Sequence, residues 1–136
     1  HLDCPTFKTS PFVDVPHLRE RRVALISTAG LQLREDRLFA RGNSDYRVFH
    51  RDTPAEGIVM SHISVILTER VISKTERGLS IERLGEMATG KVIGSVAYYH
   101  YSFIGATYPA EMAPLVRRIV GFLKEDQVNA VLLAPV

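Results

Sequence analysis

The C-terminal segment, residues 109–136, constrains the fold more than any other part of the chain. It begins with apolar residues at helical spacing and continues into the run NAVLLAPV at 129–136, which is typical of a buried strand in a parallel sheet. A helix that leads directly into such a strand forms half of a β-α-β unit, whose strands are parallel and whose crossover is right-handed. We therefore predict an α/β domain of three layers with a mostly parallel sheet, as in Rossmann-like and flavodoxin-like domains. The apolar helix positions are Met112, Leu115, Ile119, Val120 and Leu123, and Pro109 or Pro114 is expected in the first turn.

The other elements are predicted from shorter patterns. The apolar run Val23–Ile26 is expected to be the first buried strand and to end in a loop of small residues, Ser27–Gly30. Ser80 is expected to cap a helix that ends near Gly90, because apolar side chains follow it at helical spacing. Those side chains are Ile81, Leu84 and Met87. We also expect strands at 46–50 and 92–99, a strand followed by a loop at 57–67, and a polar, exposed segment at 68–78.

The composition indicates one globular domain. The chain has 136 residues, of which 46% are hydrophobic and 24% are charged, as in ordinary soluble proteins. Three prolines, at positions 5, 11 and 16, argue against regular structure in residues 1–18. We therefore expect an extended N-terminal arm at 1–18 and a single α/β domain at 19–136, with its C-terminal part missing from this chain.

Charge and cysteine content narrow the range of partners and compartments. The formal net charge is only +2, which does not favour binding to nucleic acid or to an anionic membrane. The local cluster of Arg19, Arg21 and Arg22 is expected to be a solvated entrance to the first strand. The single cysteine, Cys4, cannot form an intrachain disulfide, which fits a reducing compartment such as the cytoplasm. No apolar stretch approaches the roughly 20 residues of a membrane span.

The sequence holds no strong short motif for binding a phosphate, a dinucleotide or a metal ion, so the candidate site residues are polar residues near strand ends. Ser27 and Thr28 close the first strand and can offer hydroxyl and backbone N–H groups to an anion. The alternative is that these hydroxyls only satisfy the backbone of their own turn. Ser44 and Asp45 precede the strand at 46–50, where an Asp is often a turn residue.

Two His-Ser groupings, SHIS at 61–64 and HYSF at 100–103, extend this candidate set. In an extended chain His100 and Ser102 share one face, and Tyr101 and Phe103 share the other. A pocket with two imidazoles and several hydroxyls could bind a carboxylate or move a proton, although each His is also compatible with a structural role. We assign His62 and His100 as candidate catalytic residues. The candidate substrate-binding residues are Ser27, Thr28, Ala29, Gly30, Ser44, Asp45, Ser61, Ser64 and Ser102, and we predict no metal site.

Eight blocks occur in order along the chain. They are CPTF at 4–7, STAGL at 27–31, GNSDYRV at 42–48, DTP at 52–54, MSHIS at 60–64, VIGSVA at 92–97, HYSFIGAT at 100–107 and LKEDQVNAVLLAPV at 123–136. Together these blocks resemble selenoprotein B of the glycine/sarcosine/betaine/D-proline reductase family, and most closely its D-proline reductase-type members. The segment 66–78 departs from the family pattern, so no substrate contact is carried over to it.

The resemblance implies a subunit of a dithiol-dependent amino-acid reductase that cleaves a C–N bond. In this family a partner subunit supplies a pyruvoyl group, and a selenocysteine or cysteine of the selenoprotein subunit attacks the α-carbon of the substrate. That residue directly follows the strand that VLLAPV resembles, so we expect it immediately after Val136. The implied partners are a pyruvoyl-containing subunit, a small amino-acid substrate and a thioredoxin-like or other dithiol reductant. A homo-oligomer is a further expectation, because a bare final strand exposes apolar surface.

Two other functions remain open at this point. The first is a non-catalytic α/β binding or interaction domain that is related to the family, which the divergent segment 66–78 would favour. The second is a stand-alone racemase-like or lyase-like enzyme that uses a cysteine after the last strand.

Overall fold

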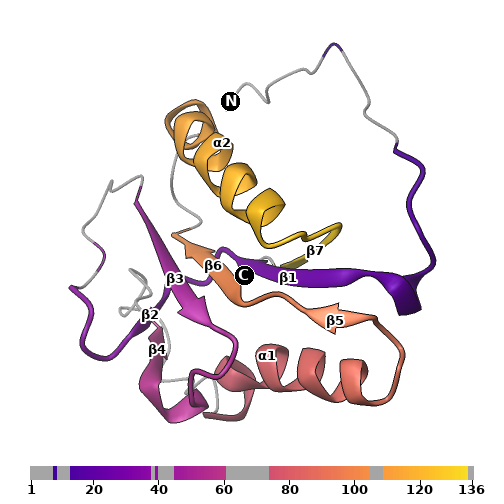
Figure 1. Cartoon of the computed structure of the whole chain (residues 1–136). Coiled ribbons are helices and arrows are strands. Elements are labelled where there is room, and N and C mark those ends of the chain that lie inside the picture. The colour runs from indigo at the N-terminus through magenta and orange to yellow at the C-terminus, as the bar shows by residue number, and fades with distance from the viewer. Residues whose placement is uncertain are drawn as a thin grey trace.

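The computed structural model describes residue 8 and residues 13–37, 39, 45–60, 74–104 and 109–134. The elements are, in chain order, a 3-10 turn at Leu18–Glu20, β1 (Arg22–Ser27), β2 (Leu31–Leu33), β3 (Tyr46–His50), a 3-10 turn at Ala55–Gly57, β4 (Ile58–Met60), α1 (Lys74–Thr89), β5 (Ser95–Val96), β6 (Tyr99–Phe103), α2 (Pro109–Glu125) and β7 (Ala130–Ala134) (Figure 1).

The strand β1 is central to the main sheet, because it pairs in parallel with three other strands. β7 lies along one edge of β1, with the register running from Val23 opposite Ala130 to Ser27 opposite Ala134. Along the other edge, β5 pairs with the beginning of β1 and β6 pairs with its end. β3 pairs antiparallel with β6, so the order across the sheet is β3-β6-β1-β7. The predicted α/β fold with a mostly parallel sheet is confirmed.

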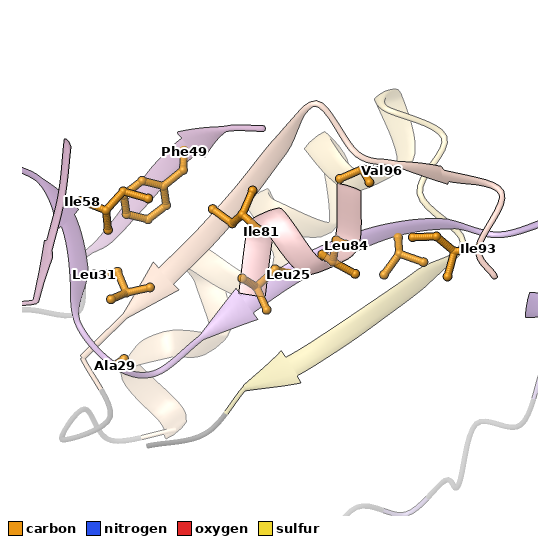
Figure 2. Packing of buried hydrophobic residues seen from close by; sticks show 10 residues of the cluster. Leu25, Ala29, Leu31, Phe49, Ile58, Ile81, Leu84, Ile93 and Val96 are labelled. Atoms are coloured by element: carbon orange, nitrogen blue, oxygen red, sulfur yellow. The ribbon is translucent and has the colours of Figure 1, made fainter. Parts of the chain in front are cut away.

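The two helices cover opposite faces of this sheet and give the domain its three layers (Figure 1). Side chains alternate along β1, so Leu25 packs on one face and Ala24 on the other. The first face packs against α1 through Ile81 and Leu84, and Figure 2 shows this cluster with Phe49, Ile93 and Val96 around it. The second face packs against the apolar stripe of α2, including Met112, Leu115, Ile119 and Leu123.

A small second sheet is formed by β2 and β4. These strands pair antiparallel, with Leu31 opposite Met60 and Leu33 opposite Ile58. Leu31 and Ile58 are buried in the same core cluster as α1, so this sheet extends the α1 face of the domain. The predicted strand in the segment 57–67 is confirmed for residues 58–60, and residues 61–67 lie outside the described part of the chain.

The strand expected at 92–99 differs from the observed structure. The ladder with β1 is interrupted at Tyr98, whose N–H donates to Asp126 Oδ2 and whose carbonyl accepts from the Arg51 N–H. β5 is therefore limited to Ser95–Val96, and pairing resumes in β6, which reaches Phe103. The continuous apolar pattern VIGSVAYY gave no signal for this break, because the break depends on partners far away in the sequence.

The helix expected from Ser80 is longer than predicted. α1 begins at Lys74, so Ser80 lies inside the helix rather than at its cap, and residues 74–78 are helical rather than part of an irregular excursion. The reason is that good helix formers such as Glu76 and Arg77 extend the helix before its apolar stripe begins. Ile81 and Leu84 are buried and Met87 is half-buried against the core, as predicted. Residues 68–73 lie outside the described residues, as does most of the predicted N-terminal arm.

The strands expected at Val23–Ile26 and 46–50 and the helix-to-strand step at the C-terminus are confirmed. The burial expected of the last strand is wrong: Val131, Leu132 and Leu133 of β7 are exposed, because β7 pairs only with β1 among the described strands. α2 begins at Pro109, and Pro114 lies within the helix. None of the described helices is long and apolar enough to cross a membrane.

The backbone of Gly94 packs closely against the backbone of residues 19–21, and this packing can be tested by substitution. A Cβ atom on Gly94 would lie 2.8 Å from the carbonyl carbon of Glu20 and 3.0 Å from the carbonyl oxygens of Arg19 and Arg21. We expect Gly94→Ala to lower the free energy of unfolding by about 1–3 kcal/mol, because backbone atoms must shift. Gly121→Ala is the matched control: no atom lies within 4 Å of its Cβ, and the change should stabilise α2 by about 1 kcal/mol. Urea denaturation of both variants measures this, and equal effects would contradict the packing described.

Candidate functional site

The ends of four strands meet at one edge of the sheet, and several predicted site residues lie there. β1, β6 and β7 are parallel, so their carboxyl ends share this edge, and antiparallel β3 begins at it. The Thr28 N–H donates to the Ala134 carbonyl at 3.2 Å, and the Gly30 N–H donates to the Phe103 carbonyl at 2.8 Å. The loop Ser27–Gly30 therefore bridges the ends of β7 and β6. We call this place the carboxyl edge.

The backbone N–H groups of this loop, and that of the first residue of β2, are all hydrogen-bonded within the domain. The Ala29 N–H donates to Ser27 Oγ at 3.2 Å, and the Leu31 N–H donates to Ser102 Oγ at 2.8 Å. Together with the bonds of Thr28 and Gly30, these contacts occupy four successive backbone donors. Gly30 has a φ of 63°, a left-handed conformation that glycine adopts without steric cost. Both serine side chains are buried, and for Ser27 the bond to Ala29 matches the alternative in which the hydroxyl satisfies its own turn. Contact of these residues with a substrate stays a prediction.

Asp45 also reaches the carboxyl edge, where it holds an arginine that the sequence did not single out. Asp45 Oδ1 accepts from the Tyr46 N–H at 2.9 Å, and its Oδ2 lies 2.7 Å from Arg47 Nη1. Arg47 is opposite Ser102 in the β3-β6 register, and its guanidinium lies 4.2 Å from the ring centre of Phe39. Arg47 could have been found from the alternation in YRVFH, because it shares a face with the buried Phe49.

His100 has a clear structural function in the sheet. Its side chain is 1% exposed, and its Nδ1 accepts a hydrogen bond from the Leu25 N–H at 3.0 Å. In a regular ladder a backbone carbonyl would accept this hydrogen bond. Beside the break between β5 and β6, the imidazole nitrogen accepts it instead. An accepting Nδ1 requires the proton of the neutral ring to be on Nε2, and no described residue accepts from that atom. Burial, only partly opposed by the charge of Asp126, lowers the pKa of His100 to about 4, so the ring is neutral at pH 7.

Some of the predicted site residues lie together in the structure, and most of the others lie outside its described part. Ser27, Thr28, Ala29, Gly30, Asp45 and Ser102 meet at the carboxyl edge, whereas His100 lies deeper on the same face as Ser102. Ser44, Ser61, His62 and Ser64 lie outside the described residues. Among the described residues, β4 ends at Met60, opposite Leu31, which directly follows the loop.

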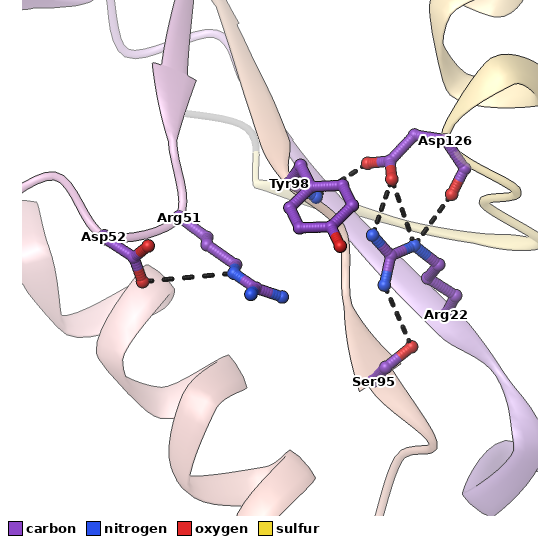
Figure 3. Close-up of polar contacts among 6 residues, drawn as sticks. All are labelled: Arg22, Arg51, Asp52, Ser95, Tyr98 and Asp126. Atoms are coloured by element: carbon purple, nitrogen blue, oxygen red, sulfur yellow. Dashed lines mark hydrogen bonds and ion pairs between the residues drawn. The ribbon is translucent and has the colours of Figure 1, made fainter.

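A second polar cluster, at the opposite end of β1, was missed by the sequence analysis. Arg22 and Asp126 form a half-buried ion pair with Nη2 and Oδ1 2.5 Å apart, and Arg22 Nε donates to the Asp126 carbonyl at 2.7 Å. Asp126 Oδ2 accepts from the Tyr98 N–H at 2.6 Å. The guanidinium groups of Arg22 and Arg51 each lie 4.6 Å from the ring centre of Tyr98 (Figure 3). We call Arg22, Tyr98 and Asp126 the clasp. The prediction that Arg22 is simply solvated is corrected by this pairing.

A groove of about 560 Å³ lies beside the clasp, between β3 and the end of α2. Its walls include the rings of Tyr46, Tyr99 and Phe122. Tyr101 also lines it, and burial together with the nearby Asp126 charge raises the pKa of Tyr101 to about 12, so its hydroxyl stays protonated. The groove is on the α2 face, away from the Ser102 side of β6, and it contains none of the predicted site residues.

Comparisons with known proteins add no assignment. No protein-family model matches the chain, and neither a curated protein nor a solved structure matches it. Within the described ranges, no group of three His, Cys, Asp or Glu side chains is placed to hold a metal ion.

The lowered pKa of His100 predicts loss of stability in mild acid. The unfolded chain takes up a proton near pH 6.5, whereas the folded chain does so only near pH 4. Stability from this group is therefore complete above pH 6.5 and is lost as the pH falls toward 4, by about 3 kcal/mol. His100→Gln keeps an acceptor but cannot be protonated, so the difference in unfolding free energy between pH 7.5 and pH 4.5 should shrink. An unchanged difference would show that another group titrates.

The clasp predicts a strong effect of removing Asp126. In Asp126→Ala the half-buried Arg22 loses its partner, and we expect a loss of about 3 kcal/mol of unfolding free energy. Glu86→Ala serves as the control, because it removes an exposed helical pair with Arg83 and should cost less than about 1 kcal/mol. Thermal and urea unfolding measure both changes, and comparable losses would argue against the clasp as a major stabilising contact.

Proposed function

We propose that this chain is a selenoprotein B-like subunit of a reductase that cleaves a C–N bond of an amino acid or an amino-acid derivative. A selenocysteine or cysteine that follows β7 would be the nucleophile, and a partner subunit would carry the pyruvoyl group. D-Proline is the first substrate to test, with glycine, sarcosine and betaine as the alternatives. The proposal rests on the ordered sequence blocks and on the geometry of the carboxyl edge.

The observation that carries the proposal is the contact between Ala134 and Thr28. Since the Ala134 carbonyl accepts from the Thr28 N–H, β7 ends next to the loop Ser27–Gly30. Ligands of open α/β sheets bind just beyond the carboxyl ends of the strands, so a nucleophile after β7 would stand at the expected position. The loop beside it consists of small residues, which fits the close approach of a second subunit.

The chemistry proposed at this edge is a two-electron reduction. The pyruvoyl group of the partner would supply an electrophilic carbonyl that holds the substrate. The selenolate or thiolate attacks the α-carbon, and the electron pair of the C–N bond leaves with nitrogen, which takes up a proton. A second thiol then attacks the selenium or sulfur, the α-carbon is protonated, and a dithiol reduces the resulting Se–S or S–S bond.

We assign different roles to the two candidate histidines. His100 is neutral at pH 7, is buried, and already accepts a hydrogen bond from Leu25, which favours a positioning function for it. His62 is therefore our choice for protonating the leaving nitrogen. The occupied donors of the loop favour a rigid platform for the nucleophile rather than a direct anion site at these N–H groups.

The same occupied donors also favour a second candidate function. A loop whose N–H groups, from Thr28 to Gly30, are all bonded within the domain suits a scaffold that binds another protein without catalysis. The two functions differ in their requirement for a nucleophile after β7.

The proposal is tested by reconstitution. The natural coding sequence after residue 136 is read first, and a cysteine codon or an in-frame selenocysteine codon is expected at residue 137. The chain extended through that region is then combined with the pyruvoyl subunit, dithiothreitol and D-proline, and 5-aminopentanoate is measured. We expect product only when both subunits are present. A different codon at 137, or no turnover of any of the four substrates, would favour the interaction domain, and turnover without a partner would favour a racemase-like or lyase-like enzyme.

The roles of the histidines are separated in the same assay. His62→Gln should lower turnover more than tenfold, because the leaving nitrogen loses its proton donor. His100→Gln should change stability and its pH dependence more than turnover. Near-normal turnover of His62→Gln would remove that residue from the mechanism.

A further inference from the structure

The outer edge of β7 has the properties of a strand-pairing surface. Among the described strands, β7 pairs only with β1, so its second edge has no strand partner. Its five residues, Ala130–Ala134, include neither a charged residue nor a proline. Side chains in the middle of the strand are unusually exposed for large apolar residues, with Val131 at 41%, Leu132 at 46% and Leu133 at 68%. Natural sheets normally protect such an edge with charges, proline or a covering segment.

The hydrogen-bonding groups on this edge can be assigned from the parallel ladder. The Ala134 carbonyl points to β1, because it accepts from the Thr28 N–H. Backbone groups alternate along a strand in a parallel pair, so Ala130, Leu132 and Ala134 face β1. The N–H and C=O groups of Val131 and Leu133 consequently face outward. These four groups are spaced as an incoming antiparallel strand requires.

The sequence of β7 is close to a palindrome in side-chain size, AVLLA. In an antiparallel pair centred on Leu132, this residue meets its own copy, Val131 meets Leu133, and Ala130 meets Ala134. The outward-facing Val131 and Leu133 then form the hydrogen-bonded pairs, and Leu132 forms the non-hydrogen-bonded pair between them. A two-fold interface must be self-complementary in this way. We propose that β7 pairs antiparallel with β7 of a second copy of this chain, which joins the two sheets into one.

Exposed apolar residues on one side of α2 also favour pairing with a second copy of the chain. Val116 and Val120 are exposed and lie one turn apart, on the flank of α2 away from Phe122. Phe122 lines the groove beside β3, which is the opposite edge of the sheet, so Val116 and Val120 lie on the side of β7. Val131 and Leu133 point to the same face, because they are opposite Ala24 and Ile26 of the α2 core. The dimer would cover these four side chains with their symmetry copies.

The other edge strand does not offer this surface. β3 carries Arg47 and His50, and Arg47 is engaged with Asp45 and the Arg37 carbonyl. The proposed dimer is also independent of the proposed reductase function. The two β7 strands would run in opposite directions, so the carboxyl edges of the two copies would face away from each other and stay open.

Cysteine cross-linking tests the register directly. In a Cys4→Ser background, which removes the only cysteine, Leu132→Cys places two thiols in a non-hydrogen-bonded pair with Cα atoms about 4.5 Å apart, within the range of a disulfide. Leu133→Cys is the matched control. Its Cα atoms would be roughly 8 Å apart, too far for a disulfide, although its side chain is more exposed. Under mild oxidation we expect the disulfide dimer to form at least about tenfold more readily in the first variant.

Sedimentation provides the second measurement. The unmodified chain should sediment as a dimer, and Leu133→Lys should sediment as a folded monomer, because it places a charge in the hydrogen-bonded pair without disturbing the core. Circular dichroism verifies the fold of each variant. A monomeric unmodified chain would overturn the proposal and would indicate that a further segment or a different protein covers β7. Equal cross-linking of the two cysteine variants would overturn the proposed register.

Discussion

The clasp is the contact on which the rest of the fold depends. Arg22 opens the central strand, Asp126 lies in the turn after α2, and Tyr98 interrupts the line of β5 and β6. One carboxylate therefore joins the start of β1 to the start of β7 and to the break in the neighbouring strand. Since the parallel strands β1, β6 and β7 begin near this point, the clasp fixes their positions relative to one another. The placement of Ser27–Gly30, Ser102 and Ala134 beside each other follows from it.

The sequence was sufficient to predict those elements whose own residues show a helical period or an apolar run. The stripe of α2, the run of β7 and the buried β1 are each recognisable from their own residues, and parallel topology then brings Ser27–Gly30 and Ser102 to one edge. The break at Tyr98 and the early start of α1 were missed. The first depends on Arg51 and Asp126, which are distant in sequence, and the second on polar helix formers that leave no apolar stripe.

Polar residues near strand ends proved harder to interpret than the fold. Ser27, Ser102 and His100 all accept hydrogen bonds from backbone N–H groups of β1, of the loop that follows it or of the start of β2. Their spacing in the sequence is the same whether they bind a ligand or complete the sheet, because both functions need an acceptor at the same place. Burial and the hydrogen bonds already made favour the structural role, and contact with a substrate stays a prediction. Arg47 illustrates the converse, since an inward charge on a strand points to a partner before that partner is known.

The imidazole of His100 has a consequence for how this sheet can vary. Positions in the middle of a strand ordinarily accept many β-forming residues, because the backbone supplies the ladder and the side chain only fills space. Here the ladder is completed by a ring nitrogen, so one position of β6 is tied to a particular side-chain chemistry and length. A residue at position 100 without an acceptor would leave the Leu25 N–H unbonded unless the break at Tyr98 closed, and closing the break would release Asp126 from the Tyr98 N–H. A local irregularity of the backbone thus links three positions that are distant in the sequence.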